Sequence, residues 1–276
     1  MNTAADDAPA VLVRAEVAPG GAAGRIVHLT LNRPEARNAM SLAMVDALLQ
    51  ALADAEAAGD VRAIVLRGAG GHFCAGGDLK DMAGAQAAGD ALGAMAAVSA
   101  RFGELCVAFA NTGIATVAVV EGSVMGGGFG LACVADLVIA GSSAVFRLPE
   151  TSLGVVPAQI APFLVERLGY AEARRLAVIG GKLDASQALG LRLVHEVHAA
   201  SALDSVVHRV LIEMMRCAPQ AVAATKALIA QARLQAPASL VPQAAQVFAQ
   251  AVLGAEGQEG TSAFVQKRPP GWAPQT

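Results

Sequence analysis

Charged and aromatic side chains are scarce in this chain of 276 residues. Charged residues account for 16% of the sequence and aromatic residues for 4%, and the formal net charge is −3. No run of basic residues is longer than two, as at Lys267 and Arg268. A protein that binds nucleic acid usually carries a basic patch that meets the phosphates, so we expect no nucleic-acid partner.

The sequence also lacks the signals of export, membrane insertion and metal binding. Its N-terminus, MNTAADDAPA, is acidic, and the two longest apolar stretches are interrupted by Glu121 and Asp136. The four cysteines show no CxxC spacing and the five histidines form no HExxH motif, which argues against a disulfide framework and a zinc site. We therefore expect a cytoplasmic protein with reduced thiols, no bound metal ion and no membrane-spanning segment.

Hydrophobic residues, in contrast, make up 55% of the chain. Short β-rich stretches alternate with stretches of helical periodicity, which predicts an α/β fold with buried strands. The expected strands are 25–31, 61–66, 116–120, 137–140, 144–148 and 194–197; the expected helices are 42–58 behind an N-cap at Ser41, 89–110, and a short one that ends at Val134. From residue 201 the pattern is helical to near the end. We divide the chain into a core, 1–200, and a C-terminal helical region, 201–276, which covers the core or mediates assembly.

Two glycine-rich loops each follow an expected strand and precede a helical segment. The first runs from Gly68 to Gly77, and the second is Gly126-Gly127-Gly128. The N-terminus of a helix has unpaired N–H groups, glycine lets a ligand approach them, and two such groups aimed at one atom form an oxyanion hole. Simple turn formation is the other interpretation. No P-loop, GxGxxG or GxSxG motif is present.

One acidic residue is placed for chemistry. Glu150 directly follows an expected strand and precedes the apolar stretch 153–156. A carboxylate between apolar segments is desolvated, which raises its pKa and suits it to proton transfer. A solvated glutamate in a loop is the alternative.

Together, these segments resemble the crotonase, or enoyl-CoA hydratase/isomerase, superfamily over nearly the whole chain. The resemblance implies an α/β fold, a crotonase-like spiral of ββα units with a C-terminal helical trimerisation region, assembled as a homotrimer or a dimer of trimers. The segments that carry it are LNRPEARNAMS (31–41), HFCAGGDLKDM (72–82), EGSVMGGGFGLACVADLVIA (121–140), FRLPETSLGVVP (146–157), ALGLRLVHEV (188–197) and EGTSAFVQKR (259–268).

The resemblance also implies a role for individual residues. Gly77 and Gly127 are expected to supply the two N–H donors of an oxyanion hole, and Glu150 the acid and base. Coenzyme A is part of the acyl-CoA substrate, so no separate cofactor is expected. The residues expected to line the coenzyme A groove are Ala36, Arg37, Asn38, Ala75, Asp78, Leu79 and Lys80; Phe264 and Lys267 are expected to contact coenzyme A, in this family usually that of a neighbouring subunit.

The chain departs from the family pattern at Gly130, where hydratases with two catalytic glutamates carry the second one. The stretches 128–133, 148–150 and 156–163 resemble the branch that hydrates 3-methylglutaconyl-CoA and isohexenylglutaconyl-CoA. The resemblance therefore predicts an enoyl-CoA hydratase of this branch. Two alternatives stay open: a Δ3,Δ2-enoyl-CoA isomerase that uses Glu150 alone, and an acyl-CoA-binding protein without catalytic activity.

Overall fold

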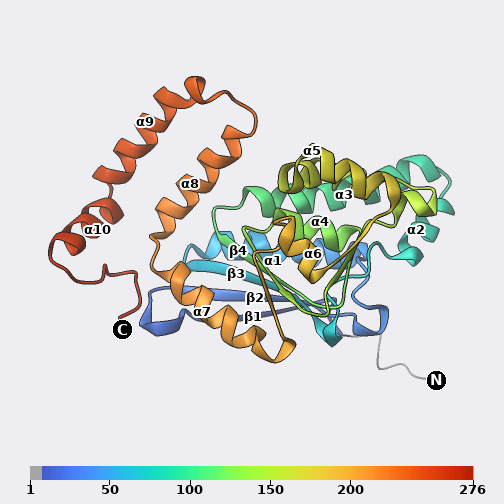
Figure 1. Cartoon of the computed structure of the whole chain (residues 1–276), viewed down its shortest axis with the longest axis horizontal. Helices are drawn as coiled ribbons and strands as arrows, with labels where there is room; N and C mark the ends of the chain where they lie inside the picture. Colours follow the sequence, from blue (N-terminus) through green and yellow to red (C-terminus); the bar gives the residue numbers. More distant parts are fainter. Residues whose placement is uncertain (1–7, 276) are drawn as a thin grey trace.

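The computed structural model describes residues 8–275, and its centre is a six-stranded sheet (Figure 1). The strands lie in the order β1-β2-β3-β4-β6-β9; β1 is antiparallel to β2 and the others pair in parallel. Burial on both faces explains why β3 and β4 are mainly apolar, with Arg62 and Arg67 of β3 and Thr116 of β4 as the exceptions. Their bounds are β1 Val11–Val17, β2 Arg25–Leu31, β3 Val61–Gly68, β4 Ala115–Val120, β6 Leu137–Gly141 and β9 Glu196–His198.

A second, three-stranded sheet lies beside the first. It contains β5 (Ser123–Met125), β7 (Val145–Arg147) and β8 (Lys182–Asp184), in the order β5-β7-β8. The chain passes from β4 to β5 and then into a helix, and again from β6 to β7 and then into a helix. Each such strand–strand–helix unit is one turn of a spiral, as expected for ββα units.

The helices on one face of the large sheet enclose the main core. Helix α1 is Leu42–Ala58: the Oγ atom of Ser41 accepts a hydrogen bond from the N–H of Met44 at 3.2 Å, and Gly59 ends the helix with φ of 70°. Its buried side chains include Met44 and Leu48. The other helices of this part are α2 Leu79–Gln86, α3 Ala91–Asn111, α4 Gly127–Val134, α5 Ala161–Ile179 and α6 Ala185–Gly190.

Helix α3 is long and apolar enough to cross a membrane, by length and composition alone. In the structure it packs against α1, α2 and α4 and buries Leu105, Cys106 and Phe109 in the core. Its Arg101 forms an ion pair with Asp46 of α1. The helix is thus an integral layer of the fold.

The predicted C-terminal helical region has two parts, one packed on the core and one that projects from it. Helix α7 (Leu203–Met215) covers the second face of the large sheet, where Val206, Val207 and Val210 join a separate buried cluster. The helices α8 (Pro219–Ala232), α9 (Pro237–Leu253) and α10 (Ala255–Val265) project away from the core as an arm (Figure 1). Within these three helices only Ala263 is buried. The projecting part therefore begins near Pro219, and α7 is the part of the region that covers the core.

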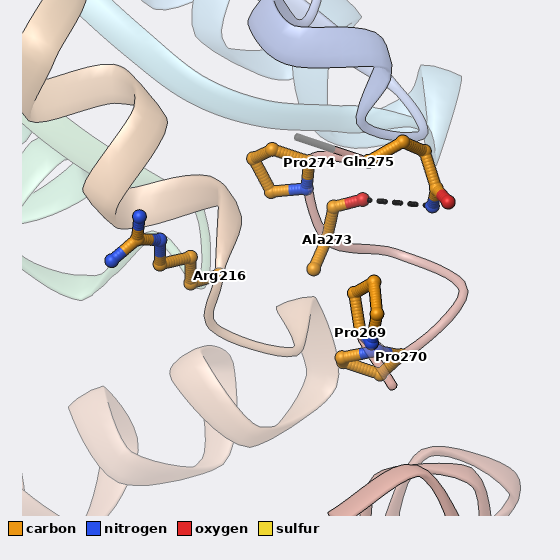
Figure 2. Close-up of a pocket in the computed structure, with 6 residues that line it drawn as sticks. All are labelled: Arg216, Pro269, Pro270, Ala273, Pro274 and Gln275. Atoms are coloured by element: carbon orange, nitrogen blue, oxygen red, sulfur yellow. Dashed lines mark hydrogen bonds between the residues drawn. The ribbon is translucent and has the colours of Figure 1, made fainter. Parts of the chain in front are cut away.

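Both ends of this arm are attached to the core through Arg62. Its guanidinium donates to the carbonyl oxygens of Cys217 at 2.7 Å, before α8, and of Trp272 at 3.3 Å, after α10. The C-terminal tail then borders a cavity of about 490 Å³ beside Arg216 (Figure 2). The N–H of Gln275 donates to the carbonyl of Gly20 at 3.0 Å, so the chain returns to the core.

The expected elements are present, but the sequence did not predict β1, β5, β8 and α2. The prediction of a single short strand after Pro157 is wrong, because β8 precedes β9. β5 and β8 have only three residues each, and their pairing partner, β7, comes from another part of the chain. Local periodicity carries no signal for such strands.

Candidate active site

The two glycine-rich loops lie side by side. The N–H of Cys74 donates to the carbonyl of Ser123 at 2.9 Å, and the N–H of Met125 donates to the carbonyl of Cys74 at 2.9 Å. The first loop therefore runs parallel to β5 and forms a β-bridge between Cys74 and Val124. Gly76 has φ of +106°, a conformation that glycine adopts readily, and it lies against the backbone of Met125.

Beyond this paired stretch, each loop begins a helix. Gly127 is the first residue of α4, and Gly77 immediately precedes Asp78, the N-cap of α2. The earliest N–H groups of a helix have no intrahelical acceptor. Within residues 8–275, neither the N–H of Gly77 nor that of Gly127 donates to a protein acceptor. Both groups are thus available to a ligand, as an oxyanion hole requires.

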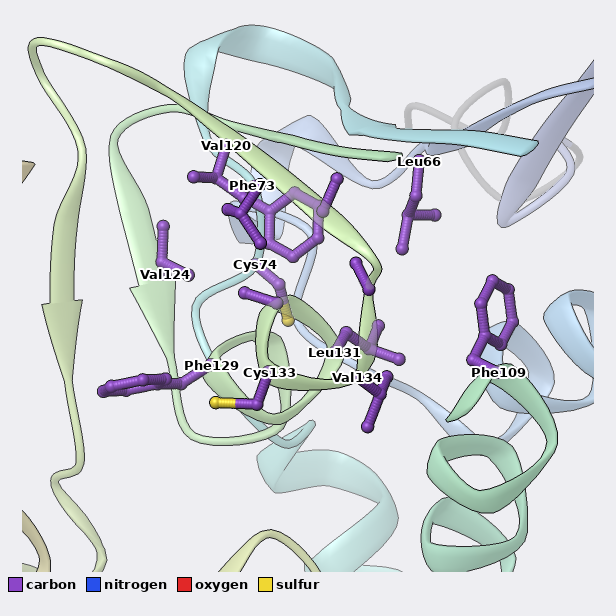
Figure 3. Close-up of a cluster of buried hydrophobic side chains, with 14 of the residues drawn as sticks. Leu66, Phe73, Cys74, Phe109, Val120, Val124, Phe129, Leu131, Cys133 and Val134 are labelled. Carbon is purple, nitrogen blue, oxygen red and sulfur yellow. The ribbon is translucent and has the colours of Figure 1, made fainter. Parts of the chain in front are cut away.

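The position of α4 is fixed by a buried cluster behind it (Figure 3). Every residue of α4 except Gly127 is buried, and the ring of Phe129 packs edge-on against Phe146 with centroids 5.5 Å apart. A Cβ atom on Gly128 would lie 2.6 Å from Cβ of Cys74, so only glycine lets α4 approach the first loop. Burial raises the pKa of the Cys74 thiol to about 11, so this thiol stays neutral.

Glu150 reaches this pair of loops from β7. It is the first residue of the 3-10 helix Glu150–Leu153, and its Oε1 atom would lie 2.8 Å from a Cβ atom on Gly126. Its Oε2 atom is buried and has no hydrogen-bond partner among the described residues. Burial raises the pKa of the carboxyl. The structure therefore favours a desolvated glutamate over a solvated one.

The source of this burial differs from the prediction. The apolar residues Leu153, Val155 and Val156 that follow Glu150 in the sequence are 69%, 41% and 72% exposed. They do not cover the carboxylate. Its neighbours are instead the glycine backbone at Gly126 and the loop that contains Gly76.

The expected coenzyme A groove is brought together by Asn38. This residue is fully buried, adopts φ of 57°, and donates from Nδ2 to the carbonyls of Ala69 at 2.9 Å and His72 at 2.7 Å. The N–H of Ala75 donates to the carbonyl of Arg37 at 3.0 Å. Residues 36–38 and 75–80 therefore form one continuous surface. On it, Arg37, Leu79 and Lys80 are exposed, and Ala36 and Ala75 are half-buried.

The side chain of Asp78 is turned into the protein beneath this surface. Its carboxylate is buried and accepts hydrogen bonds from Arg33 Nη1 at 2.5 Å and from the N–H of Lys80 at 2.7 Å. Burial opposes the charge of this carboxylate, but the bonds from Arg33 and Lys80 hold its pKa below the usual value. Its side chain is thus engaged in holding the loop and the start of α2.

Phe264 and Lys267 lie far from Glu150 within one chain. Phe264 is 85% exposed near the end of α10, and Lys267 is exposed just after that helix. The arm and α2 lie toward opposite ends of the long axis of the molecule (Figure 1). The structure of one chain therefore does not bring these two residues to its own glycine loops.

Sequence reasoning missed two apolar residues of the site. Phe102 of α3 lies against Gly127, with its ring atoms 3.2 Å from where a Cβ would be, and Ile160 lies directly beside Gly130. No local signal marks either residue, because α3 and α5 meet α4 only in the folded chain. Among the described residues, no group of three or more His, Cys, Asp or Glu side chains could hold a metal ion.

Comparison with known proteins places this arrangement in a family. The sequence model of the family described as enoyl-CoA hydratase/isomerase matches residues 21–275. The chain belongs to the enoyl-CoA hydratase/isomerase family. It is 32% identical over 247 residues to a 2,3-dehydroadipyl-CoA hydratase of Escherichia coli, covering 89% of this chain and 94% of that one. It is 34% identical over 264 residues to a probable enoyl-CoA hydratase of Rhodobacter capsulatus, covering 94% and 96%.

Solved structures confirm the crotonase-like fold of this family member. The structure of Pseudomonas aeruginosa AtuE is similar with a TM-score of 0.90 and 51% identity, over 96% of this chain and 99% of that one. An enoyl-CoA hydratase/isomerase from Marinobacter aquaeolei has a TM-score of 0.89 and 46% identity, with the same coverage. Family and relatives together identify the chain as an enzyme, a hydro-lyase.

Proposed function

We propose that this enzyme adds water across the 2,3 double bond of an enoyl-CoA thioester that carries a substituent at C3, of the 3-methylglutaconyl or isohexenylglutaconyl type. Hydratases among its relatives support the reaction. The observation that carries the proposal is the half-buried Glu150 carboxylate beside two helix starts. Over residues 8–275, one oxygen of this carboxylate and the N–H groups of Gly77 and Gly127 have no protein partner.

In the proposed mechanism, Glu150 makes both proton transfers, first as base and then as acid. The carboxylate accepts a proton from water while the water oxygen bonds to C3, and the electrons of the double bond move onto the thioester oxygen. The N–H groups of Gly77 and Gly127 donate hydrogen bonds to this enolate oxygen; one such donor is usually worth about a hundred- to a thousand-fold in rate. The carboxylic acid then returns its proton to C2, which restores the carboxylate and the thioester carbonyl.

The substrate type follows from the presence of a single carboxylate. With glycine at position 130, no second glutamate of the site orients the water. A glutaconyl-type substrate has a carboxylate of its own, which is able to accept a hydrogen bond from that water. The resemblance of the stretches 128–133, 148–150 and 156–163 to the branch that uses such substrates points the same way.

Coenzyme A binding is proposed to involve two subunits. Arg37 and Lys80 are exposed on the groove of one protomer, and Phe264 and Lys267 of the neighbouring protomer are proposed to complete it. A homotrimer or a dimer of trimers would be held by the arm, which exposes a series of large apolar side chains: Ile229, Leu234, Val241, Phe248 and Leu253.

A substrate panel tests the proposal. The purified enzyme is mixed with crotonyl-CoA, 3-methylglutaconyl-CoA and isohexenylglutaconyl-CoA, and the enoyl absorbance and the product mass are followed. We expect loss of absorbance and the added mass of one water with the branched substrates. An unchanged mass with a shifted double bond would instead identify an isomerase. No reaction with any of the three would favour a protein that only binds acyl-CoA.

A further inference from the structure

Three glycines lie at the start of α4. Gly127 and Gly130 are three residues apart and share a face of the helix, and Gly126 is its N-cap. A side chain at Gly126 would meet the carboxylate of Glu150, whereas side chains at Gly127 and Gly130 would meet the ring of Phe102. The carboxylate of Glu150 and the apolar ring of Phe102 therefore both border the start of α4.

Next to Phe102, Ile160 packs directly against Gly130. It is 3% exposed and lies directly before α5. A Cβ atom on Gly130 would overlap Cγ2 of Ile160, lie 3.2 Å from Cβ of Ile160, and lie 3.5 Å from Cζ of Phe102. Isoleucine is branched at Cβ and has few allowed χ1 rotamers, so relief of this overlap requires Ile160 to leave its present conformation. With Ile160 in this conformation, only glycine fits at position 130.

We propose that Ile160, backed by Phe102, is a specificity-determining residue that restricts the site to one carboxylate. The inference rests on the proposed function, in which Glu150 alone makes both proton transfers. An acid at position 130 would lie on the same face of α4 as Gly127, whose N–H is a proposed oxyanion donor, and Ile160 occupies the volume that it needs. Ile160 thereby selects substrates that are hydrated without a second protein carboxylate.

The steric conflict between Ile160 and a side chain at position 130 is tested by a double-mutant cycle, with the melting temperature (Tm) as the measurement. Alanine favours a helix over glycine, yet we expect Gly130→Ala to lower Tm in the wild type because of the overlap with Ile160. In the Ile160→Ala background, which removes Cγ2, the same change should raise Tm. The control is Gly190→Ala: Gly190 ends α6 and has no atom within 4 Å of an added Cβ, so its effect should be the same in both backgrounds. Equal effects of Gly130→Ala in both backgrounds would overturn the proposal.

The chemical part compares two double variants of equal size. Gly130→Glu with Ile160→Gly supplies a second carboxylate, and Gly130→Gln with Ile160→Gly supplies its amide. With crotonyl-CoA, which has no carboxylate of its own, we expect the glutamate variant to be at least about tenfold faster, since general acid–base assistance is worth about a hundredfold or more. Its kcat/KM should also depend on a second ionisation. Equal rates and equal pH profiles would refute the role of Ile160.

The experiments can refute the proposed function and the role of Ile160 independently of each other. If no variant hydrates any substrate while the cycle in Tm shows the change of sign, the proposed function is refuted and the steric restriction stands. If the wild type hydrates branched substrates but Gly130→Ala acts equally in both backgrounds, the role of Ile160 is refuted and hydration stands.

Discussion

Replacing Glu150 with glutamine keeps the shape of the side chain and removes its ability to transfer protons. Oε2 has no hydrogen-bond partner in the described part of the chain, so the amide breaks no bond there. The glycine at position 130 provides no second acid. We therefore expect kcat to fall by about a hundred- to ten-thousand-fold, which corresponds to about 3 to 5 kcal/mol of transition-state stabilisation, with KM nearly unchanged.

The same variant should be more stable than the wild type at neutral pH. Burial raises the pKa of Glu150, so the native state binds this proton more tightly than the unfolded state does. The ionised carboxylate then costs stability above its folded pKa, and this cost disappears as the pH falls below the pKa of the unfolded chain. Glu150→Gln should raise Tm at pH 7.5, and the difference should vanish in acid.

Both effects are measured on one preparation. Hydration is followed through the enoyl absorbance, binding through KM, and stability through thermal melts at pH 7.5 and in acid. Glu121→Gln is the control. Glu121 also lies in a loop after a strand, but its side chain lies beside Gly141, whereas that of Glu150 lies beside Gly126. Activity of Glu150→Gln within a few-fold of the wild type would refute the mechanism. A lower Tm at pH 7.5 would refute the desolvation argument.

Three further predictions follow from other contacts. Lys267→Ala should raise KM about tenfold or more with little change in kcat, because a phosphate contact stabilises ground and transition states alike. Lys182→Ala is the control. A loss confined to kcat would count against the assignment of Lys267 to the coenzyme A site. Arg62→Met should lower Tm and shift the mass by light scattering toward the monomer, since it frees both ends of the arm; an unchanged Tm and mass would contradict this. The kcat/KM of the wild type should decline in acid with a midpoint above the ordinary value of 4.5, because the base must be ionised; a midpoint below it would exclude Glu150 as that base.

How well the sequence predicted an element depended on how local its causes are. Helix α1 was predicted to the residue, because its cap at Ser41 and its apolar spacing all lie within the segment. Helix α2 was missed: it has eight residues, buries only Ala85, and contains Gly84, so it carries little helical periodicity. The division between α7 and the arm depends on which helix meets the sheet, and this is decided by tertiary packing.

In the candidate site, too, only the features with local causes could be predicted from the sequence. Its glycine loops and its glutamate could be named from the sequence, since strand–glycine–helix order is local and the resemblance supplied roles. The cause of the burial of Glu150 was assigned to the wrong segment, because its neighbours come from two loops that are distant in sequence. The restriction imposed by Ile160 could not be predicted at all, as it arises where α3, α4 and α5 meet.

The hydrogen bonds that join Cys74 to β5 have a consequence for the timing of catalysis. Water around a free thioester must reorient as negative charge develops, whereas peptide dipoles held by a strand-like pairing are oriented before any substrate arrives. The energetic cost of that orientation is met when the chain folds and not in each turnover. A stable enolate analogue should therefore bind without rearranging either loop, and a thioester whose carbonyl oxygen is displaced by a bulky acyl group finds no alternative set of donors.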